Sequence, residues 1–149
     1  MHVVSLIVLA APTPSTRESG SSGSPAGGYL QYMTITNALA SLAVRDLAAS
    51  ARWYEKLLGR GSHPMSEVME WQLQRGGGLQ IYELPERAGH GSCTLIVSDI
   101  DEIAGQLRST ELAADAQPAR NDRVDTIMIR DPDGNSIAFA MPKDAMLAH

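Results

Sequence analysis

Residues 127–141 read IMIRDPDGNSIAFAM, two alternating apolar runs on either side of a turn that contains proline and glycine. Pro132 presets φ for the first corner of the turn, Asp133 suits the second, and Gly134 can adopt a positive φ. In both flanking runs large apolar residues alternate with small or polar ones, which is typical of strands with one buried face. The stretch therefore predicts a β-hairpin.

The hairpin completes a β-α-β-β-β pattern in the second half of the chain. Residues 92–97 predict a strand, and Asp99 predicts the N-cap of the helix that follows, with Glu102 completing a capping box. A short extended piece over residues 116–120 comes next, and the hairpin then supplies the last two strands.

The first half of the chain repeats this order. Residues 35–44 predict a strand, and Asp46 caps a helix that Gly59 ends. The three strands that follow are expected at residues 62–65, 68–74 and 79–84, with a tight turn at Gly76–Gly78. The Val44–Leu47 and Val97–Ile100 segments occupy equivalent points in the two halves. The chain is therefore interpreted as an internal duplication.

Two modules, at about residues 34–86 and 91–141, predict an α+β domain. Each module lays its helix on a sheet, and the two sheets stand edge to edge. The expected architecture is a curved open sheet, a cup-like half barrel with the helices on the outer face and a concave inner face.

The N-terminal segment does not resemble part of this fold. An apolar run over residues 3–11 precedes a stretch over residues 12–28 that is rich in Pro, Ser, Gly and Thr and cannot form a packed core. Because no Lys or Arg precedes the run, a disordered or spurious leader before a natural start at Met33 is favoured over a secretory signal. No segment is long and apolar enough to predict a membrane span. The predicted boundaries are a leader over 1–32, a domain over 33–143 and a tail over 144–149.

Composition limits the classes of function. The chain has 149 residues, 44% hydrophobic and 19% charged, as expected of one soluble domain. A net charge of -5 without a Lys/Arg run argues against a nucleic-acid partner, and leaves attraction for a cationic ligand as one interpretation. The single cysteine, Cys93, excludes an intrachain disulfide, suits the reducing cytoplasm, and is interpreted as a packed thiol within an apolar run.

Several motifs together carry a family resemblance. They are Val44–Leu47, Trp53–Tyr54, Leu57–Gly59 and Asp131–Asn135. In this order and with the duplication, the chain resembles the glyoxalase / bleomycin-resistance / extradiol-dioxygenase superfamily, the vicinal oxygen chelate fold, over about residues 34–143. The resemblance implies the fold predicted above but says little about activity, because this fold hosts many chemistries. Family members commonly pair modules across chains, and this habit, with the open strand edges, implies a homodimer.

The resemblance also implies where a metal would bind. In metal-dependent members, four inward His, Glu or Gln side chains hold a divalent ion, and counting from the shared motifs places these positions at Leu39, Gln80, Ser92 and Ala138. Only Gln80 has a suitable donor, and one amide does not form a convergent set of three or four ligands. The sequence therefore predicts neither a metal site nor a cofactor. His90, which has the same strand parity as Ser92, is the one alternative ligand.

The same registers imply which side chains line the concave face. The predicted ligand-binding residues are Leu39, Ser41, Glu70, Gln72, Gln80, Tyr82, Ser92, Thr94, Thr126, Met128 and Ala138. Small and amphipathic side chains with one carboxylate suit a pocket that has a few polar anchors between apolar walls. Tyr54 and Trp71, in contrast, lie on apolar stripes and are interpreted as core residues.

These observations favour a metal-independent small-molecule-binding protein of the glyoxalase/bleomycin-resistance type, with its ligand in the concave groove. One alternative is an enzyme of the same superfamily: a metal-dependent lyase, isomerase or dioxygenase, or a metal-free catalyst that uses Glu70 or Tyr82. A second alternative is a non-catalytic module with a vestigial groove. Catalytic residues stay unassigned, because the sequence gives no Ser-His-Asp or Cys-His arrangement.

Overall fold

The computed structural model describes residues 37–144, so the predicted leader over 1–32 and nearly all of the predicted tail lie outside the described residues. The elements in chain order are β1 (Leu39–Val44), α1 (Leu47–Leu58), β2 (Ser62–Met65), β3 (Val68–Gln72), β4 (Gly78–Glu83), the 3-10 helix η2 (Pro85–Arg87), β5 (Ser92–Ile96), α2 (Ile100–Ser109), β6 (Ala119–Arg120), β7 (Val124–Arg130) and β8 (Ser136–Pro142). None of the helices described is long and apolar enough to cross a membrane.

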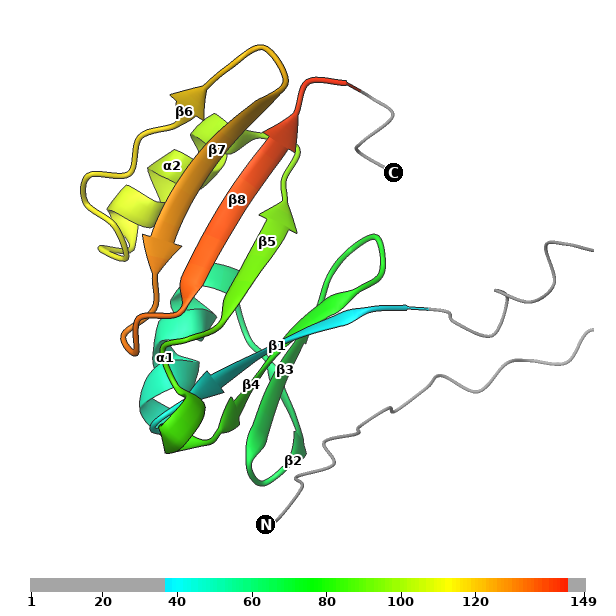
Figure 1. Cartoon of the computed structure of the whole chain (residues 1–149), viewed down its shortest axis with the longest axis vertical. Helices are drawn as coiled ribbons and strands as arrows, with labels where there is room; N and C mark the ends of the chain where they lie inside the picture. The colour runs from blue at the N-terminus through cyan, green and yellow to red at the C-terminus, as the bar shows by residue number, and fades with distance from the viewer. Residues whose placement is uncertain (1–36, 145–149) are drawn as a thin grey trace, which may run out of the picture.

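Hydrogen bonding divides the strands into two sheets with the same internal order. The first sheet runs β1-β4-β3-β2 and the second runs β5-β8-β7-β6. In each sheet the first strand of the module pairs in parallel with the last, and the remaining pairs are antiparallel. Figure 1 shows the two sheets as separate units, with β1 and β5 as the strands through which they contact each other. The predicted duplication and the α+β class are confirmed.

Strand alternation decides which face of each sheet is buried under its helix. In the first module Leu42, Val44, Leu79 and Ile81 are buried in the core together with α1 residues such as Tyr54. The equivalent core residues of the second module are Leu95, Ile127, Ile129, Ile137 and Phe139. Side chains of the opposite parity point away from the helices, so the predicted lining residues do share the helix-free face. Tyr54 and Trp71, predicted as core, are 0% and 3% exposed.

The two helices begin at the predicted caps. The Asp46 carboxylate accepts a hydrogen bond from the Ala49 amide at 2.7 Å, and Asp99 accepts from the Asp101 and Glu102 amides at 2.9 Å each. These bonds satisfy amides that have no partner within the helix. The helix boundaries at Asp46 and Asp99 therefore follow from local chemistry.

The strand β3 ends two residues before its predicted end, and the helix α2 ends before the apolar residue Leu112. The strand expected to reach residue 74 ends at Gln72, because the Leu73 amide already donates to the Gly77 carbonyl across a turn in which Gly76 and Gly77 have positive φ. Helix α2 ends at Ser109, and the chain turns at Glu111, which has φ +59°. Leu112 still packs against the core, so burial alone does not define a helix.

The predicted hairpin loop joins the two modules. Gly134 has φ +99° and its amide donates to the Asp131 carbonyl at 3.0 Å, as the predicted turn requires. The buried Tyr54 hydroxyl of α1 donates to the Asp131 carboxylate at 2.8 Å. Burial, together with this carboxylate, raises the pKa of Tyr54. The fully buried Asn135 amide donates to the Ala43 carbonyl at 2.8 Å, so the loop is bonded to two elements of the first module.

An ion-pair cluster fixes the far end of the second sheet. Asp125 on β7 is only 1% exposed and pairs with the Arg120 guanidinium at 2.8 Å and the Lys143 ammonium at 3.1 Å. Arg120 also pairs with Asp101 of α2 at 2.6 Å. Burial by itself pushes the pKa of Asp125 upward, but Lys143 and Arg120 outweigh it and hold that pKa below its ordinary value.

The Asp125→Asn variant is expected to be less stable than the parent protein at neutral pH, and the difference is expected to shrink in acid. A carboxyl group whose pKa is lowered by folding stabilises the protein above its unfolded-state pKa of about 3.9, and this contribution is lost as the pH falls through the folded-state value. Urea unfolding from neutral to strongly acidic pH measures the difference. Asp122→Asn, which changes an exposed carboxylate in the adjacent loop, is the control and should show a nearly constant difference. A constant difference for Asp125→Asn would contradict the assignment.

Candidate functional site

The structure places the four family metal positions symmetrically. Leu39 and Ser92 are the first residues of β1 and β5, the opening strands of the two modules. Gln80 and Ala138 occupy matching positions in β4 and β8, the closing strands. Leu39 is thus equivalent to Ser92, and Gln80 to Ala138, in the two duplicated modules. This equivalence agrees with the positions obtained by counting along the sequence.

The side chains at these positions do not fit a divalent ion. Leu39 and Ala138 have no donor atom, Ser92 is exposed, and the Gln80 amide already donates to the Ser41 hydroxyl at 2.6 Å. Within residues 37–144, no group of three or more His, Cys, Asp or Glu side chains is placed to hold a metal ion. A divalent ion needs about three or four convergent ligands, which this set does not supply.

A pocket of about 270 Å³ lies where β1 and β4 meet the linker between the modules, residues 85–91. Its lining residues are Ser41, Ala43, Tyr82, Glu86, Arg87, His90 and Gly91. Ser41 and Tyr82 reach it from the helix-free face of the first sheet, and η2 with the following linker forms the opposite wall. Small apolar surfaces and a few convergent polar groups are the usual composition of a ligand pocket.

The charged wall of this pocket was missed in the sequence interpretation. Glu86, Arg87 and His90 lie on the segment between β4 and β5. Glu86 and Arg87 were not among the predicted site residues, and His90 was considered only as an alternative metal ligand. This segment follows β4 directly in the sequence, so it must begin at the end of the helix-free face. That proximity was the available signal for its role in the pocket. His90 was the alternative metal ligand, and Glu86 is the only other imidazole or carboxylate group in the pocket lining. Two such donors do not complete a metal site.

Next to the pocket, the first sheet carries buried polar side chains on its helix-free face. Gln80 pairs across the strands with Ser41 on one side and Glu70 on the other. Gln80 is 5% exposed and Glu70 is 9% exposed. The Gln72 amide donates to Glu70 Oε1. Ser41 and Gln80 thus form one hydrogen-bonded pair and Glu70 and Gln72 form a second, and the two pairs are neighbours across β4 and β3.

The predicted residues of the second module form a different surface. Thr94 and Met128 are exposed on the helix-free face, and Thr126 and Ala138 are half-buried. Met128 on β7 is 69% exposed, and Ile96 on β5, which was not predicted, is 58% exposed on the same face, with β8 between the two strands. This face carries exposed apolar side chains together with serine and threonine, whereas the face of the first module carries buried polar side chains. The predicted lining residues are thus not gathered in a single pocket.

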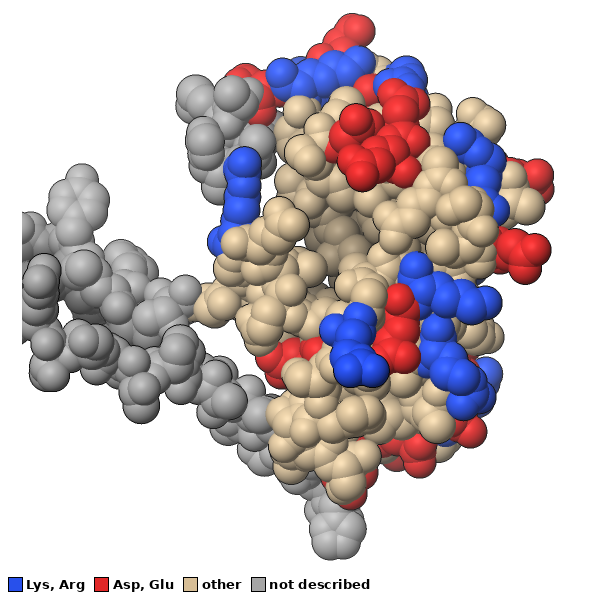
Figure 2. All heavy atoms as spheres, turned by 180° about the vertical axis from the view of Figure 1, so that it is seen from behind, with Lys and Arg blue, Asp and Glu red and all other residues tan. Residues whose placement is uncertain are grey.

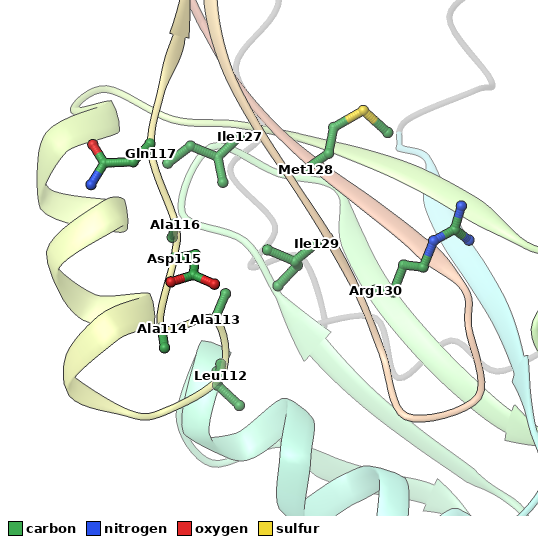
Figure 3. A pocket seen from close by; sticks show the side chains of 10 residues that line it. All are labelled: Leu112, Ala113, Ala114, Asp115, Ala116, Gln117, Ile127, Met128, Ile129 and Arg130. Carbon is green, nitrogen blue, oxygen red and sulfur yellow. The ribbon is translucent and has the colours of Figure 1, made fainter.

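A larger hollow, of about 320 Å³, lies between β7 and the segment that follows α2. Its lining residues are Leu112, Ala113, Ala114, Asp115, Ala116, Gln117, Ile127, Met128, Ile129 and Arg130. Figure 3 shows Ile127 and Ile129 pointing toward this segment, while Met128 and Arg130 point away from it. Because few polar side chains converge there, it is a weaker candidate for specific recognition than the smaller pocket.

Charges of both signs are mixed on the surface. Figure 2 shows a hollow near the centre of the face in view, with Lys and Arg side chains beside Asp and Glu side chains around it. The described residues on this face form no continuous basic stripe of the kind that follows a nucleic-acid backbone.

Cys93 on β5 is half-buried, and burial, followed by the nearby Asp131 carboxylate, raises the pKa of its thiol. A raised pKa disfavours the thiolate that a nucleophilic cysteine requires. The geometry thus agrees with the interpretation of Cys93 as a packed thiol.

Comparison with solved structures identifies the class of protein. A glyoxalase / bleomycin resistance protein from Catenulispora acidiphila DSM 44928 is 35% identical, with a TM-score of 0.59, over 70% of this chain and 96% of its own. A bleomycin-binding protein in complex with bleomycin is 21% identical, with a TM-score of 0.57, over 73% of this chain and 100% of its own. The oxidase ChaP-H2 is 20% identical, with a TM-score of 0.60, over 76% of this chain and 98% of its own.

The chain belongs to the glyoxalase/bleomycin resistance protein family of the vicinal oxygen chelate superfamily. No protein-family model matches it, and no curated protein matches it. Because an oxidase and a drug-binding protein share the fold at about the same identity, the fold does not distinguish catalysis from binding.

Proposed function

We propose that the chain is a metal-independent small-molecule-binding protein that holds its ligand in the groove on the helix-free face. The observation that carries the proposal is the chemistry at the four family metal positions. Leu39 and Ala138 have no donor atom, so two of the four positions cannot bind a metal whatever their orientation. The remaining two, an amide and an exposed hydroxyl, are too few for a stable site.

The pocket between β1, β4 and the linker supports the binding part of the proposal. It combines the Ser41 and Tyr82 hydroxyls with the Arg87 guanidinium in about 270 Å³, a volume near the lower limit of small-molecule sites. The bleomycin-binding protein with the same fold shows that a member of this architecture can hold a drug. We further propose a homodimer in the cytoplasm, in which a second chain covers the exposed apolar residues Ile96 and Met128.

Thermal unfolding against a broad panel of metabolites and antibiotics tests the proposal. At least one compound is expected to raise Tm by about 5 °C or more when present at about 100 times its Kd. Arg87→Ala should reduce that shift, because Arg87 lines the pocket. Arg52→Ala, which removes an exposed arginine from the outer helix α1, is the matched control and should leave the shift unchanged.

Two outcomes would overturn the proposal. If no compound raised Tm, the groove would be vestigial. If Arg87→Ala and Arg52→Ala had equal effects on a stabilising compound, the ligand would bind elsewhere on the chain.

A further inference from the structure

The outer strand of the second sheet covers its neighbour only in part. Strand β6 contains two residues and pairs with β7 at Asp125 and Thr126, whereas β7 continues to Arg130. On its other side β7 pairs with β8 along its whole length. Among the described residues, no strand therefore lies hydrogen-bonded to the outer side of residues 127–130.

The first module covers the equivalent part of its sheet. Gln80 and Ala138 are equivalent in the two modules and pair with Glu70 and Met128, so Met128 corresponds to Glu70. Glu70 pairs on its other side with Ser62 of β2. Within residues 37–144, Met128 has no strand partner on that side. The open edge is therefore specific to the second module and is not a general feature of the fold.

The backbone of this edge presents hydrogen-bonding groups at every second residue. The Asp131 amide donates to the Asn135 carbonyl across the hairpin, and successive residues of a strand direct their N–H and C=O groups to opposite sides. Ile129 therefore bonds to β8, and the N–H and C=O groups of Met128 and Arg130 face outward. No backbone hydrogen bond joins these groups to a turn or loop in the described part of the chain.

The hollow of about 320 Å³ lies along the same edge, between β7 and residues 112–117. Figure 3 shows the side chains of Ile127 and Ile129 pointing toward this segment. The lining is mostly apolar, and its two charged residues, Asp115 and Arg130, have opposite signs. Because side chains that lie opposite each other on adjacent strands share a face, alternate side chains of an added strand would enter this hollow.

We propose that residues 127–130 of β7 bind one extended peptide segment of a partner protein as an added strand. The segment is uncharged, and its alternate residues are apolar. An extended main chain supplies N–H and C=O groups at the two-residue spacing that Met128 and Arg130 present, which is the basis of recognition by strand addition. The pocket of the proposed function lies against β1 and β4, so this inference does not depend on it.

A second copy of this chain fits the edge less well than a single peptide. The β7 strand of a second copy is hydrogen-bonded to its own β8, so it would bring a whole sheet toward the space that residues 112–117 bound. A free peptide has no sheet behind it and needs only the strand spacing of about 4.8 Å.

Amide hydrogen exchange in the full chain measures the state of the edge residue by residue. The Met128 and Arg130 amides are expected to exchange at least about ten times faster than the Ile129 amide, which bonds to β8. Addition of the peptide acetyl-Thr-Val-Thr-Leu-Thr-Val-Thr-amide at about 1 mM should slow exchange at Met128 and Arg130 and leave Ile129 unchanged.

Two isomeric N-methylated peptides separate strand addition from simple contact with apolar side chains. In the added strand, the amides of the two inner threonines donate to β7, whereas the valine amides face away from it. Methylation of the two inner threonine amides should weaken binding at least about ten-fold, because two hydrogen bonds are lost. Methylation of the two valine amides should weaken binding less, since both bonds to β7 remain.

Met128→Pro tests the protein side of the same hydrogen bonds. Proline removes an amide that faces outward, so the ladder between β7 and β8 keeps its bonds. Peptide binding should be at least about five-fold weaker than in Met128→Leu, which keeps the amide and an apolar side chain. Thermal unfolding of both variants verifies that they are folded.

Three binding results would overturn the inference: no binding of the parent peptide at about 1 mM, equal binding of the two N-methylated isomers, and equal binding by Met128→Pro and Met128→Leu. Slow exchange of the Met128 amide in the protein alone would overturn it as well. Protection that increases with protein concentration would assign the edge to a second copy, and protection independent of concentration would assign it to a segment of the same chain.

Discussion

Replacing Asn135 by alanine is expected to destabilise the protein by about 3 kcal/mol, because one side chain joins the two modules. The Asn135 amide nitrogen donates to the Ala43 carbonyl and to the Asp131 carboxylate at 2.8 Å each, and its oxygen accepts from the Gly91 amide at 2.9 Å. Asn135 is 0% exposed. Without this side chain, buried groups on both sides of the junction lose their partners.

Urea unfolding at neutral pH measures this loss, and Asn121→Ala is the matched control. Asn121 also accepts backbone hydrogen bonds, from the Arg123 and Val124 amides at 2.8 and 2.9 Å, but it is exposed. Water replaces those bonds, so the control should lose less than about 1 kcal/mol. Equal losses in the two variants would show that the Asn135 bonds do not hold the junction.

The Gly89→Ala substitution is expected to cost about 3 kcal/mol or more, again at the junction. Gly89 has φ +84°, and a Cβ atom there would lie 2.3 Å from the Asp133 carbonyl oxygen. The methyl group would force the linker away from the hairpin loop, because the contacted atom belongs to the backbone and cannot rotate aside. The free energy of unfolding measures the loss.

Gly59→Ala separates the steric clash from the backbone strain. Gly59 has a similar φ of +78°, but nothing lies within 4 Å of its Cβ position. Gly59 has ψ −164°, a backbone conformation that is nearly restricted to glycine, so this variant should lose about 1–3 kcal/mol from backbone strain alone. If both glycine variants lost the same stability, the contact between the linker and the loop would contribute nothing.

The fold was predictable because its signals are local and occur twice. The caps Asp46 and Asp99, the glycine turns and the strand alternation each depend on neighbours in sequence, and the duplication made each module a check on the other. The element ends were less predictable. Leu112 is apolar and packs on the core, yet it follows the end of α2, since packing and helical hydrogen bonding are separate requirements.

The site was predictable only in part. Parity along the strands placed Ser41, Gln80 and Glu70 on one face, and the registers between β1, β4 and β3 align them. Burial differs between the two modules, and a local pattern cannot predict this difference, because it depends on how β2 and the linker pack in three dimensions. Arg87 and Glu86 were missed for the same reason, since a linker has no periodicity that would orient its side chains.

The metal content of protein purified without chelator, measured by elemental mass spectrometry, tests the central claim most directly. Leu39 and Ala138 remove two of the four family ligands, so less than about a tenth of an equivalent of any transition metal is expected. Near one equivalent of nickel, zinc, iron or manganese would contradict the proposal and would favour the alternative that the chain is a metal-dependent enzyme. His90, the alternative metal ligand, would then be the first residue to mutate.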